Sequence, residues 1–175
     1  HVAADTLLAR CGSNDCGLYK DQFGALHRSP NCSLSCITTL DLSNYALTSL
    51  TAGVFDGLSS MTALALQENQ LTSLPAGVFD GLSSLQHLNL NDNRLLSLPD
   101  GIFSGLSVLQ ELYFRQNQLV SLPDGVFNGL SLLRFLSIRG NPLTSLPDGA
   151  CSGLSALQEL YIYETQLTVL PDREF

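Results

Sequence analysis

Hydrophobic residues recur along this chain with a fixed period of 24 residues, and the pattern within each period is nearly constant. The segment from Leu74 to Leu82 reads LPAGVFDGL, and it returns with few changes at 98–106, 122–130 and 146–154. A constant period in the range of roughly 20–50 residues is typical of proteins built from stacked structural repeats. We therefore expect one supersecondary unit per copy, repeated along a single axis.

The aligned copies share the pattern L-x-x-L-x-L-x-x-N-x-L-x-x-L-P-x-G-x-F-x-G-L. In L-x-x-L-x-L the last two leucines alternate with polar or small residues, which predicts a short strand with one buried face. Proline and glycine follow in each copy, and they favour turns because Pro presets φ and Gly adopts φ > 0. Each copy is thus predicted to hold one strand and one irregular return segment.

This register divides the chain into a different N-terminal segment, 1–36, and a series of repeats over 37–175. The predicted copies are 37–60, 61–84, 85–108, 109–132, 133–156 and a partial copy at 157–175. Four copies carry an asparagine at the same position, where a buried amide is expected to satisfy backbone groups of neighbouring coils: Asn69, Asn93, Asn117 and Asn141. One copy is too small to bury its apolar face alone, whereas stacked copies form a continuous core.

The repeat resembles the leucine-rich repeat family in its extracellular 24-residue class. The sequence of residues 71–82, LTSLPAGVFDGL, looks most like that of the variable lymphocyte receptors of jawless vertebrates. The resemblance implies an α/β-type repeat solenoid, a leucine-rich-repeat horseshoe. Its parallel β-sheet would be concave and its convex side irregular or 3₁₀-helical. The family's C-terminal cap has no counterpart before Phe175, so we expect weak self-association through an uncapped last strand.

Four of the five cysteines, Cys11, Cys16, Cys32 and Cys36, lie in the segment before the first repeat. A solenoid end needs a cap, and clustered cysteines there predict a disulfide-bonded cap in an oxidising compartment. A zinc site is the alternative, although zinc usually favours closer pairs. The resemblance implies pairing of the first cysteine with the third and the second with the fourth, Cys11–Cys32 and Cys16–Cys36. The spacing departs from the family's, so three connectivities remain open.

Two further sequence features concern single residues. Asn31-Cys32-Ser33 matches the N-glycosylation sequon, so Asn31 is a candidate glycan site. Cys151 occupies the position of Phe55, Phe79 and Phe103 in other copies, and it is expected to be a small buried hydrophobe.

Charge and composition exclude several classes of function. The net charge of −8 argues against nucleic acid as a partner, and no apolar run is long enough to insert into a membrane. The histidines His1, His27 and His87 are far apart and lack metal-ligand spacing, and no catalytic motif is present. We therefore predict a protein that is not an enzyme and needs no cofactor or metal.

The residues between the strand leucines should point outward onto the concave sheet. These positions differ from copy to copy, whereas the return segments repeat Ser49, Ser73, Ser97, Ser121 and Ser145. Several acids on the concave side are not required by turns, and aromatic and arginine residues, which are typical of binding hot spots, lie among them. The predicted ligand-binding set is Glu68, Asp92, Glu111, Tyr113, Arg115, Phe135, Arg139, Glu159, Tyr161 and Glu164. The alternative is a solvated face with cross-strand ion pairs, such as Glu111 with Arg134 or Arg139.

These features together predict an extracellular recognition protein, either secreted or part of a surface-anchored protein. The resemblance implies an immune receptor that binds a protein antigen or a microbial surface glycan on its concave face. The alternative is a structural or signalling matrix or adhesion protein with one fixed protein ligand. Binding to bacteria or to purified cell-wall glycans would separate the two.

Overall fold

Each copy contributes one three-residue strand whose central leucine is buried, except in the last strand, where Leu160 is half-buried. The strands are β4 (Thr39–Asp41), β6 (Ala63–Ala65), β7 (His87–Asn89), β8 (Glu111–Tyr113), β9 (Phe135–Ser137) and β10 (Glu159–Tyr161). They form a parallel sheet in chain order, and Leu40 faces Leu64, which faces Leu88. The strands thus lie at the positions that the alternating leucines predict.

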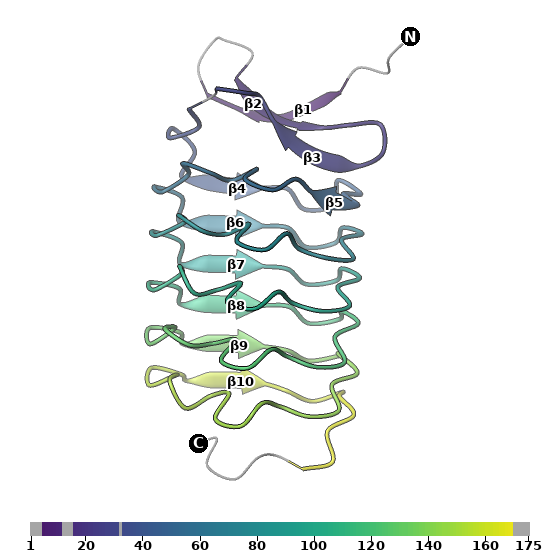
Figure 1. Ribbon diagram of the computed structural model, residues 1–175, viewed down its shortest axis with the longest axis vertical. Helices are drawn as coiled ribbons and strands as arrows, with labels where there is room; N and C mark the ends of the chain where they lie inside the picture. The colour runs from purple at the N-terminus through teal and green to yellow at the C-terminus, as the bar shows by residue number, and fades with distance from the viewer. Residues whose placement is uncertain (1–4, 12–15, 32, 170–175) are drawn as a thin grey trace.

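The computed structural model describes residues 5–11, 16–31 and 33–169, and its repeats stack as parallel coils along one axis (Figure 1). The return segments consist of separate turns, such as those in which the Val78 N–H donates to the Pro75 carbonyl and the Asp80 N–H to the Gly77 carbonyl. Within the described ranges no residue is helical. The predicted parallel-sheet solenoid is confirmed, and its return side is irregular because proline and glycine break each coil into single turns.

Leucines and a column of phenylalanines fill the space between the sheet and the return segments. The Phe55 and Phe79 ring centroids lie 6.3 Å apart, and those of Phe79 and Phe103 lie 6.4 Å apart. Phe114, from the strand side of its coil, then stacks between Phe103 and Phe127. Cys151 continues the column as a buried thiol, as its position predicts.

The asparagine column is buried and joins each coil to the preceding one. Asn117 is typical: its Oδ1 accepts from the Leu95 N–H at 3.0 Å, and its Nδ2 donates to the carbonyls of Leu90 and Phe114. Asn69, Asn93 and Asn141 repeat these bonds with the equivalent residues. The predicted ladder is therefore confirmed, and it satisfies backbone groups that would otherwise be buried without partners.

A second sheet adjoins the N-terminal end of the stack. The strands β1 (Thr6–Arg10), β2 (Gly17–Lys20) and β3 (Ala25–Arg28) are antiparallel, and β3 pairs in parallel with β5 (Ser49–Leu50) of the first copy. The side chains of Leu18, Leu26 and Leu34 are fully buried and extend the hydrophobic core into this sheet. The N-terminal residues thereby cover the first coil of the core.

The disulfide pairing differs from the one that the family resemblance implied. Cys11 bonds to Cys36, with their Cα atoms 5.9 Å apart, so the pairings Cys11–Cys32 and Cys16–Cys36 are both wrong. Cys16 is disulfide-bonded as well, and Cys32 lies outside the described residues. The end of β1 lies against the start of the first repeat, which places the first cysteine beside the last. This bond also excludes a zinc site built from all four cysteines.

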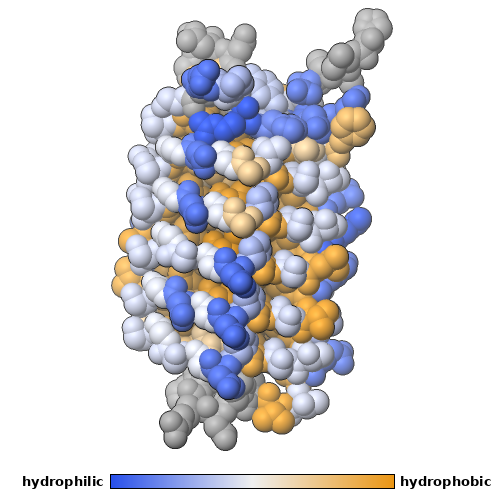
Figure 2. All heavy atoms as spheres, in the orientation of Figure 1, coloured by the Kyte–Doolittle hydropathy of each residue, from blue (hydrophilic) through white to orange (hydrophobic). Residues whose placement is uncertain are grey.

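Figures 1 and 2 view the molecule with the return segments in front of the sheet. A broken line of strongly hydrophilic residues runs down this return face, with hydrophobic residues visible between them and along the edges (Figure 2). The repeated serines at 49, 73, 97, 121 and 145 are all exposed, as are Leu96 and Val120. The opposite, outer face of the six-stranded sheet is the concave face of the sequence prediction, and we call it the sheet face.

Candidate functional site

The side chains predicted to bind ligand form neighbouring groups on the sheet face. Five of them are strand residues that alternate with buried leucines: Glu111, Tyr113, Phe135, Glu159 and Tyr161. Arg115 and Arg139 follow two residues after their strands, and Glu68, Asp92 and Glu164 occupy the turn that ends each strand segment. The predicted residues from Glu111 to Glu164 other than Arg115 form one connected group through the contacts below, and Arg115 forms a separate pair with Asp92. Glu68 makes no such side-chain contact among the described residues.

Four aromatic rings form a continuous row across β8, β9 and β10, which we call the aromatic strip: Tyr113, Phe135, Tyr161 and Tyr163. Successive ring centroids lie 4.7, 5.2 and 6.2 Å apart, in tilted and edge-on arrangements that aromatic pairs favour. Tyr113 and Phe135 are half-buried against their neighbours, and Tyr163 is 50% exposed. The two-residue spacing of Tyr163 from Tyr161 places it on the same face in the sequence, although it is not one of the ten residues predicted to bind ligand.

Two of these tyrosines donate to a glutamate two residues earlier in the same strand. The Tyr113 Oη lies 2.9 Å from Glu111 Oε2, and the Tyr161 Oη lies 3.0 Å from Glu159 Oε2. Burial, followed by the hydrogen bond to Glu111, raises the pKa of Tyr113 to about 12. The hydrogen bond to Glu159 is the main cause of a raised pKa at Tyr161. Both phenols therefore remain neutral donors held by carboxylates.

Arg139 is held at the edge of the aromatic strip by Glu164 of the next coil. Its Nε and Nη2 donate to the two carboxylate oxygens at 3.0 and 2.9 Å, and its guanidinium lies 4.8 Å from the centroid of Tyr163. These bonds from Arg139 lower the pKa of Glu164. A bidentate pair of this kind fixes the orientation of both side chains, so the strip has a defined border.

The remaining ion pairs on this face differ from the sequence-based alternative. Glu111 pairs with His87, whose Nδ1 lies 3.1 Å from Oε2, and Arg115 pairs with Asp92 at 3.3 Å. The expected pairs of Glu111 with Arg134 or Arg139 are not formed in the described part of the chain. Arg139 extends instead toward Glu164, and Glu111 is directly opposite His87 in the strand register.

The turn after each strand bears on the expectation that turns do not require the acids of the sheet face. Glu68, Asp92 and Glu164 have φ values of 57°, 54° and 58°, in the left-handed region, and Gly140 has 70° at the same position. Asp41 also takes part in a local turn, because its Oδ1 accepts from the Ser43 N–H and Oγ. Turns therefore do involve these acids. The left-handed region favours Gly, Asn and Asp, so it explains Asp92 but gives no reason for Glu68 or Glu164.

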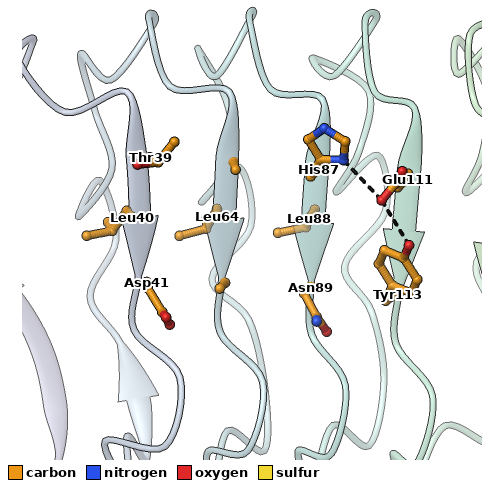
Figure 3. A pocket seen from close by; sticks show the side chains of 11 residues that line it. Thr39, Leu40, Asp41, Leu64, His87, Leu88, Asn89, Glu111 and Tyr113 are labelled. Atoms are coloured by element: carbon orange, nitrogen blue, oxygen red, sulfur yellow. Dashed lines mark hydrogen bonds and ion pairs between the residues drawn. The ribbon is translucent and has the colours of Figure 1, made fainter.

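A hollow of about 330 Å³ lies on the sheet face beside the aromatic strip. Ala63 and Ala65 form its floor because β6 carries only methyl groups where neighbouring strands carry larger side chains. Thr39 and Asp41 lie on one side, and His87, Asn89, Glu111 and Tyr113 lie on the other (Figure 3). The dashed lines in Figure 3 show that His87 and Tyr113 both contact Glu111. A second hollow of about 280 Å³ lies over the strip itself.

Other sequence-based candidates take up positions away from this face. Asn31 and Ser33 of the sequon are exposed, and the central Cys32 lies outside the described residues. Among the described residues no three His, Cys, Asp or Glu side chains are grouped to hold a metal ion. That part of the chain also contains no helix that is long and apolar enough to span a membrane.

The sequence profile described as "Leucine rich repeat" matches residues 36–95 and 84–143. The chain belongs to the leucine-rich repeat family. A leucine-rich-repeat protein of Leptospira interrogans has a similar solved structure, with a TM-score of 0.68 and 32% identity over 77% of this chain. The leucine-rich repeat domain of APL1B aligns with a TM-score of 0.71 and 25% identity, also over 77%. A comparison with curated proteins returns no match.

This leucine-rich repeat chain covers 33% and 40% of those two proteins. Members of the family present an extended surface built from repeated coils, and the fold suggests a protein-interaction role. The Cys11–Cys36 disulfide fits an extracellular protein.

Proposed function

We propose that this leucine-rich repeat protein is an extracellular recognition module, similar to variable lymphocyte receptors, that binds a protein antigen or a microbial surface component on its sheet face. The observation that carries the proposal is the aromatic strip. Its four rings lie on the outside of a sheet whose core is already filled by leucine and phenylalanine. Exposed apolar patches are typical of binding sites, and aromatic and arginine side chains are frequent hot spots.

The contrast between the two faces supports the same proposal. The repeated serines of the return segments are exposed in five copies and keep one identity. The outward strand residues are also at the surface, but they change from Ala63 and Ala65 to His87 and Asn89 and then to Glu111 and Tyr113. Free drift of solvent-facing residues would affect both faces alike. The strand residues vary more than these repeated serines, which is consistent with selection for binding on the sheet face.

The ion pairs around the strip favour a defined ligand over a merely solvated surface. Arg139 and Glu164 form a bidentate pair over Tyr163, and Glu111 and Glu159 orient the phenols of Tyr113 and Tyr161. Side chains that are already ordered lose less conformational entropy on binding. The strip therefore presents rings, hydroxyls and carboxylates in a fixed arrangement, which suits hydroxyl-bearing glycans and protein surfaces alike.

The experiment is a binding screen of the chain against whole bacteria, purified cell-wall glycans and a displayed panel of extracellular proteins. A matched pair of double variants then locates the site: Tyr161→Ala with Tyr163→Ala on the sheet face, and Leu96→Ala with Leu132→Ala on the other exposed surfaces. The first should weaken binding by at least about tenfold, which corresponds to about 1.4 kcal/mol. The second should bind like the parent, and the opposite ranking would refute the proposal.

The screen also separates the immune function from its alternative, a matrix or adhesion protein with one fixed ligand. Binding to bacteria or cell-wall glycans supports the immune role. Binding to one extracellular protein alone, with the same dependence on Tyr161 and Tyr163, would favour the adhesion role while keeping the site.

A further inference from the structure

The hollow floored by Ala63 and Ala65 differs in chemistry from the aromatic strip next to it. Its floor consists of two methyl groups on β6, and Thr39 and His87 flank Ala63 in the strand register. Asp41 and Asn89 flank Ala65 in the same way. Beyond them, the ring of Tyr113 lines the side nearest the aromatic strip (Figure 3). The hollow is thus an apolar floor with polar groups along its rim.

Two carboxylates stand on opposite sides of this floor. The hydrogen bonds of Asp41 within the described residues fall on Oδ1, from the N–H and Oγ of Ser43. Those of Glu111 fall on Oε2, from Tyr113 and His87. The other oxygen of each carboxylate has no hydrogen-bond partner among the described residues, so it can accept from an incoming donor. The bonds from Ser43 also lower the pKa of Asp41, which keeps this group ionised at neutral pH.

We propose that this hollow receives a lysine or arginine side chain of the partner protein, with its aliphatic stem on the Ala63 and Ala65 floor and its charged head at Asp41 or Glu111. The inference rests on the proposed function, and it narrows the partner to a protein with a protruding basic residue. Lysine and arginine are the side chains that combine a long apolar stem with a cation. The ring of Tyr113 adds a favourable face for that cation.

Charge selects this occupant over the other side chains that would fit by size. A neutral aliphatic side chain would cover the two carboxylates without supplying a hydrogen-bond donor, which is costly. An acidic side chain would face two like charges and a chain with a net charge of −8. The charged head of a basic side chain donates charge-assisted hydrogen bonds to the carboxylate of Asp41 or Glu111.

The inference is tested on the intact chain by amide NMR with three small probes: N-acetyl-lysinamide, N-acetyl-argininamide and the uncharged N-acetyl-norleucinamide. The two cationic probes should shift the amides of β4 and β6 in a saturable way, with at least about tenfold higher affinity than the neutral probe. Ala65→Leu fills the hollow and should abolish these shifts. Ala76→Leu, on an exposed return-side position, is the matched control and should leave them unchanged.

Equal binding of the neutral probe would show that the hollow takes an aliphatic chain and would overturn the inference, as would absence of saturable shifts in β4 and β6. The partner captured in the binding screen gives a second readout. Asp41→Asn and Glu111→Gln keep the side-chain shapes, and together they should lower the affinity for that partner by at least about tenfold. If this pair and Ala65→Leu leave partner binding intact while Tyr161→Ala with Tyr163→Ala removes it, the hollow is not used but the sheet face remains the binding site.

Discussion

Single asparagines connect the coils of this protein. The amide of Asn117 accepts from the Leu95 N–H and donates to the Leu90 carbonyl of the preceding coil, and it also donates to Phe114 of its own coil. Aspartate has no donor for the carbonyls, and leucine has neither a donor nor an acceptor. The position therefore requires an amide of this length.

Asn117→Ala should lower the free energy of unfolding by about 2–4 kcal/mol, because it leaves several buried backbone groups unpaired at roughly 1–3 kcal/mol each. Urea unfolding of the variant and the parent measures the difference. Asn128→Ala, at an exposed return-side position, is the control and should change stability by about 0.5 kcal/mol or less. Equal losses at both positions would contradict the ladder.

Tyr113 provides a pH-dependent test at the same scale. Its pKa is raised from 10.0 to about 12, so its contribution to stability is fully present below pH 10 and is lost as the pH rises toward 12. Absorbance titration of the phenolates should contain one component near pH 12 that disappears in Tyr113→Phe. If the component lost in this variant titrates near pH 10, the phenol of Tyr113 is not held as the structure shows.

At the scale of elements, the repeat strands could be predicted from the sequence and the N-terminal sheet could not. The period of 24 residues sets the register of β4 and of β6 to β10, and alternation of leucines sets which side is buried. The strands β1, β2 and β3 belong to no repeat. The parallel pairing of β3 with β5 joins segments more than twenty residues apart. The disulfide pairing depends on how this N-terminal sheet is arranged. The pairing order implied by the family resemblance was therefore wrong here.

The pairing in the N-terminal segment is open to direct chemical test. Peptide mapping without reduction should yield a Cys11–Cys36 peptide and no Cys11–Cys32 peptide. Removing the Cys11–Cys36 bond with paired serine substitutions should cost about 2–5 kcal/mol. A Cys11–Cys32 peptide in the native protein would refute the arrangement of β1 against the first repeat.

The phenylalanine column is the second testable element. The repeated phenylalanines of the column come from the return segments, but Phe114 enters it from the strand side because it replaces a strand leucine. Phe127→Ala should cost about 3–5 kcal/mol, since its ring is buried and the coils cannot collapse around the cavity. Thermal unfolding measures this loss. Phe23→Ala, where the ring is 75% exposed, should leave the transition nearly unchanged.

At the scale of the whole molecule, the sequence identifies which residues share the sheet face but not which of them touch. Strand alternation places Glu111, Tyr113 and Phe135 on one surface, as predicted. Their contacts depend on side-chain rotamers across neighbouring coils, and Glu111 meets His87 and not an arginine. The sequence carries a signal for the left-handed turn that the sequence analysis did not use. Asn44 and Gly140, residue types that favour positive φ, occupy the same position of the repeat as Glu68.

The central claim is that the sheet face, and the aromatic strip on it, recognises the partner. Oxidative footprinting of the chain with and without its captured partner, read by mass spectrometry, tests this claim directly. We predict that the partner protects Tyr161 and Tyr163, which are exposed in the chain alone, while Leu96 and Val120 on the return side keep their reactivity. Protection of Leu96 and Val120 with unchanged oxidation of both tyrosines would place the partner on the return face and contradict the account.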